Sequence, residues 1–173
     1  MMNNQIKELT LLAISTSILI VQEYLFQLLP NIQLTTLLIL VYTYVYGLKK
    51  SVTIVFVYVI IDNLMFGSIG MLHVVIPMLL AWQLIVVSFY YLSRYTKHIL
   101  IYGFFGYLMG HIYGLMFVPF QSWILNLPML PYLIADIPFQ IIFAISNFLT
   151  IIWLFEPLSS FLRDLYQRYH PTN

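Results

Sequence analysis

Acidic side chains occur inside some of the most apolar stretches of this sequence. Glu23, Asp62 and Asp136 each lie among leucine, isoleucine and aromatic residues, and His111 lies in a further apolar stretch. A charged side chain near the centre of a bilayer costs on the order of 3 kcal/mol even on the mild insertion scale, so such residues are rare and usually functional. These ionisable groups are therefore the first candidates for chemistry or binding.

Helical spacing places these groups at a similar depth. With 1.5 Å of rise per residue, the depth below the expected outer helix ends is roughly 9 Å for Glu23, 12 Å for Asp62, 8 Å for Asp136 and 10 Å for His111. Amide side chains lie near the same layer: Gln22, Asn63 and Gln140. Each acid alone could bond to a neighbouring helix as structural glue. The shared depth favours an outward-facing polar cavity.

The charge of this layer indicates which solutes such a cavity would accept. It contains no lysine or arginine, and His111 is the one possible counter-ion for the acids. We therefore expect a cationic or neutral, donor-rich solute rather than an anion. Nearby aromatic rings could stack on a flat heterocycle or hold a cation, although with 17% aromatic residues in the chain each ring more often serves packing: Tyr24, Phe66, Tyr107, Tyr113 and Trp123.

The elements that must position these residues are long apolar runs. The chain has 62% hydrophobic and 8% charged residues, whereas soluble domains carry about 25% charged residues. A bilayer core needs about 20 helical residues, and the runs that approach this length are 9–29, 34–48, 51–69, 71–92, 99–118 and 131–154. The sequence predicts an all-α integral membrane protein, with residues 1–173 forming a single membrane domain, a bundle of six transmembrane helices. Residues 119–131 are expected to form an outer loop, and 159–173 a polar cytoplasmic tail with a short helical extension.

The basic residues predict the orientation. With six spans, all seven lysines and arginines fall on one side of the membrane: Lys7, Lys49, Lys50, Arg94, Lys97, Arg163 and Arg168. The positive-inside rule assigns this side to the cytoplasm. Both termini are then cytoplasmic, and the expected location is the cell membrane.

Several kinds of chemistry have no sequence signal here. The chain has no cysteine, its four histidines are scattered, and its net charge of +1 does not suit a nucleic-acid partner. It contains no zinc-binding helix motif, no nucleophile elbow and no phosphate-binding Walker loop. We therefore expect a protein that is not an enzyme and has no metal or cofactor of its own.

Small residues follow helical spacing in two places. Gly106, Gly110 and Gly114 form a strip that allows close approach of another backbone, and packing within the bundle is favoured over an oligomer contact. Ala13 and Ser17 form a small-x-x-x-small pair in the first run.

These motifs bear a likeness to one family. Lys-Glu-Leu-Thr-Leu-Leu-Ala-Ile-Ser-Thr opens the first run, Leu-Pro-Asn-Ile-Gln-Leu-Thr-Thr follows it, and Asp-Asn precedes Phe-Gly-Ser at the end of the third. Over nearly its whole length the chain resembles the substrate-binding S components of energy-coupling factor (ECF) transporters, which take up vitamins in bacteria. The family's helix 1 usually carries Ala-x-x-x-Ala, and here the second small residue is serine.

The resemblance implies a mechanism, partners and a binding site. An S component binds a vitamin from outside and releases it inward when it docks on a transmembrane coupling protein (the T component), driven by two cytoplasmic ATPases that use the ATP. Ala13 and Ser17 would form the docking surface. By position the site would involve Asn31, Gln33, His73, Trp123 and Asp136, to which the depth argument adds Glu23, Asp62, Asn63, His111 and Gln140.

The acid-rich layer limits the classes of possible substrate but does not identify one substrate. It favours a thiamine- or hydroxymethylpyrimidine-like heterocycle or another amine. Pantothenate or another vitamin carrying a carboxylate remains an alternative if backbone amides or helix N-termini hold that group.

Two other functions remain open from the sequence. One is a structural membrane protein of the cell-elongation machinery, of the rod-shape-determining type, which would bind partners but no solute. The other is an intramembrane enzyme, for which no nucleophile and base pair is recognisable. A ligand in the pocket, lost on Asp62→Asn or Asp136→Asn, would distinguish transport from both.

Overall fold

The computed structural model describes residues 4–29 and 31–169. These residues form six helices: α1 (Asn4–Phe26), α2 (Thr35–Tyr46), α3 (Leu48–Met65), α4 (Leu72–Tyr95), α5 (Ile99–Ile124) and α6 (Met129–Tyr169). Pro30, expected to break the first run, and residues 170–173 of the tail lie outside the described part. The fold is all-helical over the described residues.

Four of the helices, α1, α4, α5 and α6, are long and apolar enough to cross a membrane. Their outward faces are apolar: Leu25 is 75% exposed and Phe104 is 61% exposed. Such a surface suits lipid, because contiguous apolar patches of this extent are rare on soluble monomers. The described fold is compatible with an α-helical membrane protein. The 12 residues of α2 span only about 18 Å.

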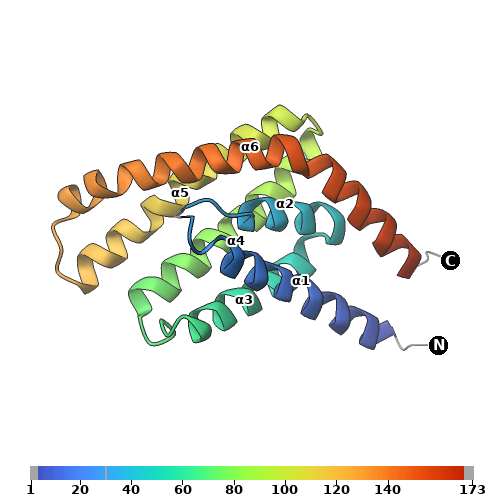
Figure 1. The fold of residues 1–173 in the computed structure, drawn as a ribbon, viewed down its shortest axis with the longest axis horizontal. Coiled ribbons are helices and arrows are strands. Elements are labelled where there is room, and N and C mark those ends of the chain that lie inside the picture. The colour runs from blue at the N-terminus through green and yellow to red at the C-terminus, as the bar shows by residue number, and fades with distance from the viewer. Residues whose placement is uncertain (1–3, 30, 170–173) are drawn as a thin grey trace.

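The helices form an elongated bundle in which α6 runs along one side and packs against α5 (Figure 1). The beginning of α1 and the end of α6 lie at the same end of the molecule (Figure 1). There the Lys7 Nζ donates a hydrogen bond to the Tyr169 carbonyl over 3.1 Å. The C-terminal part of α6 changes direction (Figure 1), and Pro157 is the proline within that part. A proline inside a helix removes one backbone hydrogen bond and causes such kinks.

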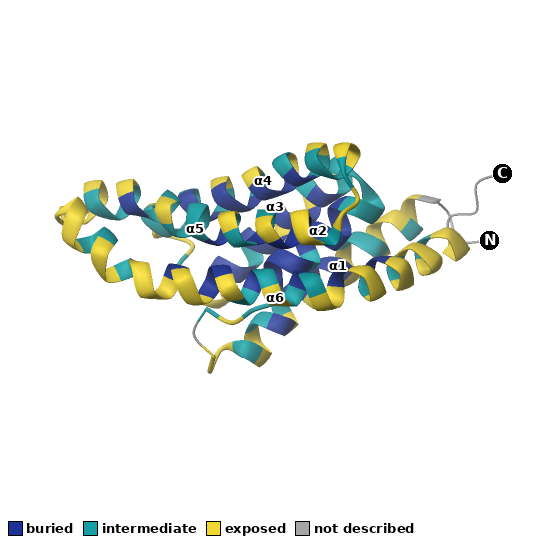
Figure 2. Ribbon diagram, turned by 90° about the horizontal axis from the view of Figure 1, so that it is seen from above, coloured by how far each residue is buried: buried dark blue, intermediate teal, exposed yellow. Residues whose placement is uncertain are grey.

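The core lies in the middle of the bundle, around α2 and the facing sides of α3 and α4. Figure 2 shows the buried residues concentrated there and exposed residues at both ends of the molecule. The largest fully buried side chains are aromatic, with Trp82 and Tyr58 foremost. Because α2 is buried along most of its length, its short span is covered by protein rather than by lipid.

The glycine strip packs within the bundle, as the sequence analysis favoured. A Cβ added to Gly110 would lie 2.7 Å from the Ala144 Cα, and one added to Gly106 would overlap the Ile151 side chain. The strip therefore lets α5 and α6 approach at backbone distance, as small residues do in membrane helix pairs.

The helix bounds differ from the predicted runs mainly at the α5–α6 connection. The outer loop expected at 119–131 is a short link, because α5 continues through Pro119 to Ile124 and α6 begins at Met129. Membrane helices tolerate proline when neighbouring groups satisfy the freed carbonyl. The link turns at Asn126, which adopts a left-handed φ of 52°, and the Leu127 amide donates to the Ser122 carbonyl over 3.1 Å. This is a Schellman ending.

The other bounds shift by smaller amounts or extend into the tail. The helix of the first run begins at Asn4 and ends at Phe26 rather than covering 9–29. The last helix continues to Tyr169 instead of ending at 154, so the described part of the expected tail is helical. Gly47 separates α2 from α3 with φ 80° and ψ 177°, a backbone conformation that is essentially restricted to glycine.

Candidate functional site

A cavity of about 260 Å³ opens beside Asp136 between α5, α6 and the connection from α1 to α2. We call it the Asp136 hollow. Its wall is mostly aromatic and small-residue surface with a few polar groups: Asn31, Gly110, Tyr113, Gly114, Phe117, Tyr132, Asp136, Phe139, Gln140 and Phe143. A mainly apolar wall with few convergent polar groups is typical of small-molecule sites. The hollow brings together the predicted residues Asn31, Asp136 and Gln140.

The polar groups of the Asp136 hollow are organised along one face of α6. Tyr132, Asp136 and Gln140 follow one another at intervals of four residues, which places them on one helix face. The Gln140 Nε2 donates a hydrogen bond to the Asp136 Oδ2 over 2.8 Å. Gln140 is buried, and its side chain fits because Gly114 has none: a Cβ there would lie 2.6 Å from the Gln140 Cγ.

Glu23 and Asp62 form a second polar group, which we call the carboxyl pair. The Tyr58 hydroxyl donates a short hydrogen bond to the Glu23 Oε2, and the Asp62 carboxyl lies close enough to Glu23 for the two groups to interact electrostatically. Asp62 is buried, and its Oδ1 has no hydrogen-bond partner within the described residues.

Tyr113 connects the Asp136 hollow with the carboxyl pair. Its ring lines the hollow and contacts the Trp82 ring, with a centroid separation of 4.6 Å. Its hydroxyl lies close enough to Glu23 and Asp62 to interact with both electrostatically. The three acids expected at one depth therefore occupy two adjacent places, with one tyrosine between them.

Three of the predicted site residues lie elsewhere. The His111 ring packs against the Tyr107 ring, with centroids 5.0 Å apart, and does not line the Asp136 hollow. Trp123 is 80% exposed. His73 is half-buried at the start of α4 and is not part of the hollow either.

Two further predicted residues, Gln33 and Asn63, make structural hydrogen bonds. The Ser68 hydroxyl donates to the Asn63 Oδ1 over 2.6 Å, and the Asn63 amide donates to the Val59 carbonyl over 2.8 Å. Asn63 thus stabilises the end of α3. Gln33 accepts a hydrogen bond from the Thr35 hydroxyl over 3.2 Å at the start of α2.

Gln22 connects the first two helices. Its Nε2 donates to the Thr35 hydroxyl over 2.6 Å, and its Oε1 accepts from the Leu34 amide over 2.9 Å. These bonds fix the beginning of α2 against α1. These bonds therefore fix the α2 end of the α1–α2 connection, which contributes Asn31 to the Asp136 hollow.

Tyr58 and Tyr132 are not among the site residues predicted from the sequence. Tyr132 could have been predicted from the spacing, because it stands one helical turn before Asp136 on the same helix face. Tyr58 could not have been, since its contact with Glu23 depends on how α3 packs against α1.

The proposed docking residues lie on the outside of α1. Ala13 and Ser17 are both exposed, and the Ser17 hydroxyl donates to the Ala13 carbonyl over 2.8 Å. The serine hydroxyl is thus satisfied within its own helix, which leaves a small, weakly polar surface.

No group of three side chains able to hold a metal ion occurs among the described residues. In the comparisons with known proteins, no family model matches the chain, no curated protein matches it, and no solved structure matches it. The geometry of the Asp136 hollow and the carboxyl pair therefore carries the functional argument.

Proposed function

We propose that this protein is the substrate-binding S component of an ECF-type importer, which captures a small vitamin or related micronutrient. The observation that carries the proposal is the Asp136 hollow. It is a cavity of about 260 Å³ with aromatic walls and a carboxylate held by Gln140. A purely structural membrane protein has no need of such a cavity.

The charge and size of the Asp136 hollow support a class of substrate. Asp136 is the one charged residue in its wall, so it would hold a cationic or hydrogen-bond-donating group, while Tyr132 and Phe117 offer ring faces for stacking. Sites for drug-sized ligands occupy about 300–1,000 Å³, and this volume is slightly smaller. A single-ring, hydroxymethylpyrimidine-like heterocycle fits the proposal better than a two-ring vitamin such as thiamine.

The proposed membrane arrangement has six spans, with both termini in the cytoplasm and the protein in the plasma membrane. The basic residues support it, because Lys7 near the start of α1 hydrogen-bonds to the Tyr169 carbonyl at the end of α6, next to Arg168. In this arrangement α2 crosses as a largely buried helix, and α3 crosses with one face exposed, where Phe56 and Leu64 lie.

The proposed partners are a transmembrane coupling protein and two cytoplasmic ATPases. The exposed small-residue face at Ala13 and Ser17 supports docking, since small residues permit close approach of a second membrane helix. ATP would be used by the partner subunits, and this chain would catalyse no reaction itself.

A ligand-binding measurement on the purified protein tests the proposal. Mass spectrometry of protein released from detergent should detect a bound small amine or pyrimidine, and its affinity is then measured for Asp136→Asn. We expect affinity to fall at least about tenfold, the loss of roughly 1.4 kcal/mol. Asp164→Asn is the matched control, because Asp164 is exposed on the same helix outside the hollow.

Co-purification tests the partners separately. The tagged chain should capture a second membrane protein together with two ATPases, and Ala13→Leu should weaken that capture without changing ligand affinity. An empty hollow under all conditions, combined with capture of cell-elongation proteins, would favour the structural alternative.

A further inference from the structure

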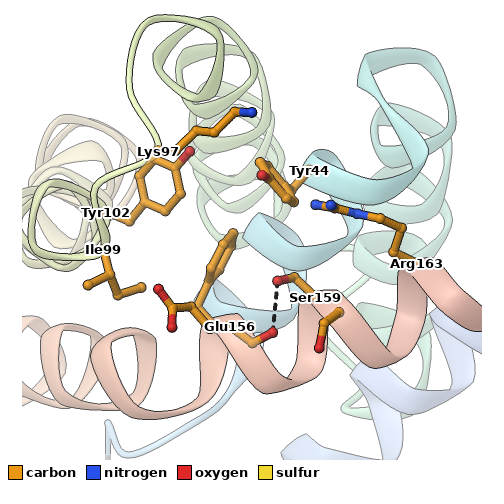
Figure 3. A pocket seen from close by; sticks show the side chains of 9 residues that line it. Tyr44, Lys97, Ile99, Tyr102, Glu156, Ser159 and Arg163 are labelled. Atoms are coloured by element: carbon orange, nitrogen blue, oxygen red, sulfur yellow. Dashed lines mark hydrogen bonds between the residues drawn. The ribbon is translucent and has the colours of Figure 1, made fainter.

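A second polar cavity shares no lining residue with the Asp136 hollow. Its volume is about 220 Å³, and it opens between the end of α2, the α4–α5 connection and α6. We call it the Arg163 pocket. Figure 3 shows its lining side chains, which include Tyr44, Lys97, Tyr102, Glu156 and Arg163.

The floor of the Arg163 pocket is a packed aromatic cluster. The Tyr102 and Phe155 rings lie 5.0 Å apart, and the Tyr44 and Phe155 rings lie 5.4 Å apart. The Tyr102 hydroxyl donates to the Thr96 carbonyl over 2.7 Å. This bond holds the connection just before Lys97, so the pocket is built on buried structure.

The charged groups around this floor are not paired with one another. Within the described residues the one ion pair joins Lys50 and Glu8, so Lys97, Glu156 and Arg163 form none. The Arg163 guanidinium lies over the Tyr44 ring, 5.0 Å from its centroid. Figure 3 shows the Glu156 carboxyl toward Ile99 and the Arg163 guanidinium toward Tyr44, on opposite sides of the pocket. Both signs of charge therefore face one small cavity.

Exposed aromatic residues indicate the depth of this pocket in the membrane. Tyr95, two residues before Lys97, is 87% exposed, and Trp153, one helical turn before Glu156, is 70% exposed. Exposed tyrosine and tryptophan concentrate where lipid headgroups meet water. The Arg163 pocket thus lies at the level of the headgroups.

We propose that the Arg163 pocket binds a phosphate ester that also carries an amine, as in the headgroup of an ethanolamine phospholipid. The guanidinium of Arg163 and the ammonium of Lys97 would hold the phosphate, which planar guanidinium groups bind in a two-pronged manner. The Glu156 carboxylate would hold the amine. A purely anionic headgroup would leave Glu156 facing a like charge, which disfavours it. This site is separate from the Asp136 hollow and does not depend on the proposed function.

Native mass spectrometry of the purified protein in detergent tests the proposal. The protein is titrated with phosphatidylethanolamine, with phosphatidylglycerol, which lacks the amine, and with soluble phosphoethanolamine as competitor. We expect the ethanolamine lipid to bind at least about tenfold more tightly than the glycerol lipid, as one well-placed charge-assisted contact would give. If low concentrations of phosphoethanolamine fully displace the ethanolamine lipid, the ligand of this site is a soluble compound. If phosphoethanolamine does not displace the lipid, the ligand is the lipid itself.

Variants assign the binding to this pocket. Arg163→Gln should weaken ethanolamine-lipid binding about tenfold, and Glu156→Gln should remove the preference over phosphatidylglycerol while retaining binding. Arg168→Gln is the matched control, because Arg168 is exposed on the same helix and outside the pocket. Equal binding of both lipids to the unmodified protein, or equal effects of the Arg163 and Arg168 variants, would overturn the proposal. Unchanged melting temperatures would exclude misfolding as the cause.

Discussion

The Tyr58 hydroxyl hydrogen-bonds to the Glu23 carboxylate and so joins α3 to α1 beside Asp62. Tyr58 is fully buried, and removing its hydroxyl would leave Glu23 without this donor. We expect Tyr58→Phe to lower the free energy of unfolding by about 1–3 kcal/mol, the cost of leaving a buried polar group unsatisfied. Denaturant titration in detergent measures this.

The control for that substitution is Tyr91→Phe. Tyr91 is 53% exposed, so loss of its hydroxyl should change the unfolding free energy little. An equal effect of the two substitutions would mean that the Tyr58 bond to Glu23 does not stabilise the bundle.

Gly110→Ala should destabilise the protein, because it forces α5 and α6 slightly apart. The added Cβ would lie 2.7 Å from the Ala144 Cα, and backbone cannot rotate away as a side chain can. We expect a loss of about 1–3 kcal/mol, typical of overpacking, seen as a lower melting temperature. Gly70→Ala is the matched control, because a Cβ there meets nothing within 4 Å.

Gly114→Ala should act on the Asp136 hollow more than on stability. Here the added Cβ would meet the Gln140 side chain, 2.6 Å from its Cγ, and this flexible side chain can turn aside. Turning breaks its 2.8 Å hydrogen bond to Asp136. We expect weaker solute binding with a smaller drop in melting temperature than Gly110→Ala causes. Unchanged affinity would argue against a role for Gln140 in the hollow.

Lys50 should make the attachment of the C-terminal part of α6 sensitive to high pH. Its Nζ lies 2.9 Å from the Glu8 carboxylate and 2.9 Å from the Tyr166 hydroxyl. Burial lowers the pKa of Lys50, but these two partners outweigh it, and the net shift is upward from 10.5. A raised folded pKa means that the stabilisation is complete below 10.5 and is lost as pH rises through the higher folded value.

Stability measured between pH 9 and 12 tests this expectation. The unmodified chain should lose more stability over that range than Lys50→Gln does, because the variant has no charge to lose there. Lys49→Gln serves as the control, since Lys49 is exposed. Parallel pH profiles for all three proteins would show that the Lys50 contacts do not stabilise the fold.

The sequence predicted the helical class well, because apolar runs long enough to span a bilayer carry a strong signal. It misplaced the end of α5, since Pro119 was interpreted as a helix breaker and the structure continues through it. The helical extension expected in the tail is continuous with α6, which was predicted to end at 154. Pro157 bends α6 without ending it, and helix continuation past a proline depends on packing that the sequence does not display.

The candidate site was predictable only in part. Asp136 and Gln140 are one helical turn apart, so their contact follows from spacing alone. The depth of a residue along its helix, however, does not determine on which face of the helix its side chain lies. His111 follows Gly110 in the sequence, so it stands about 100° around the helix from that position on the hollow. It faces Tyr107 instead.

The glycine strip between α5 and α6 also determines how strictly the Asp136 hollow selects solutes by size. The two backbones already touch at Gly110 and Ala144, so this wall cannot contract around a smaller molecule. Homologous compounds that differ by one methylene should then differ in affinity by about 1–3 kcal/mol, as rigid apolar pockets discriminate. The rigid wall at the glycine strip would therefore select solutes by their size, independently of their contacts with charged groups.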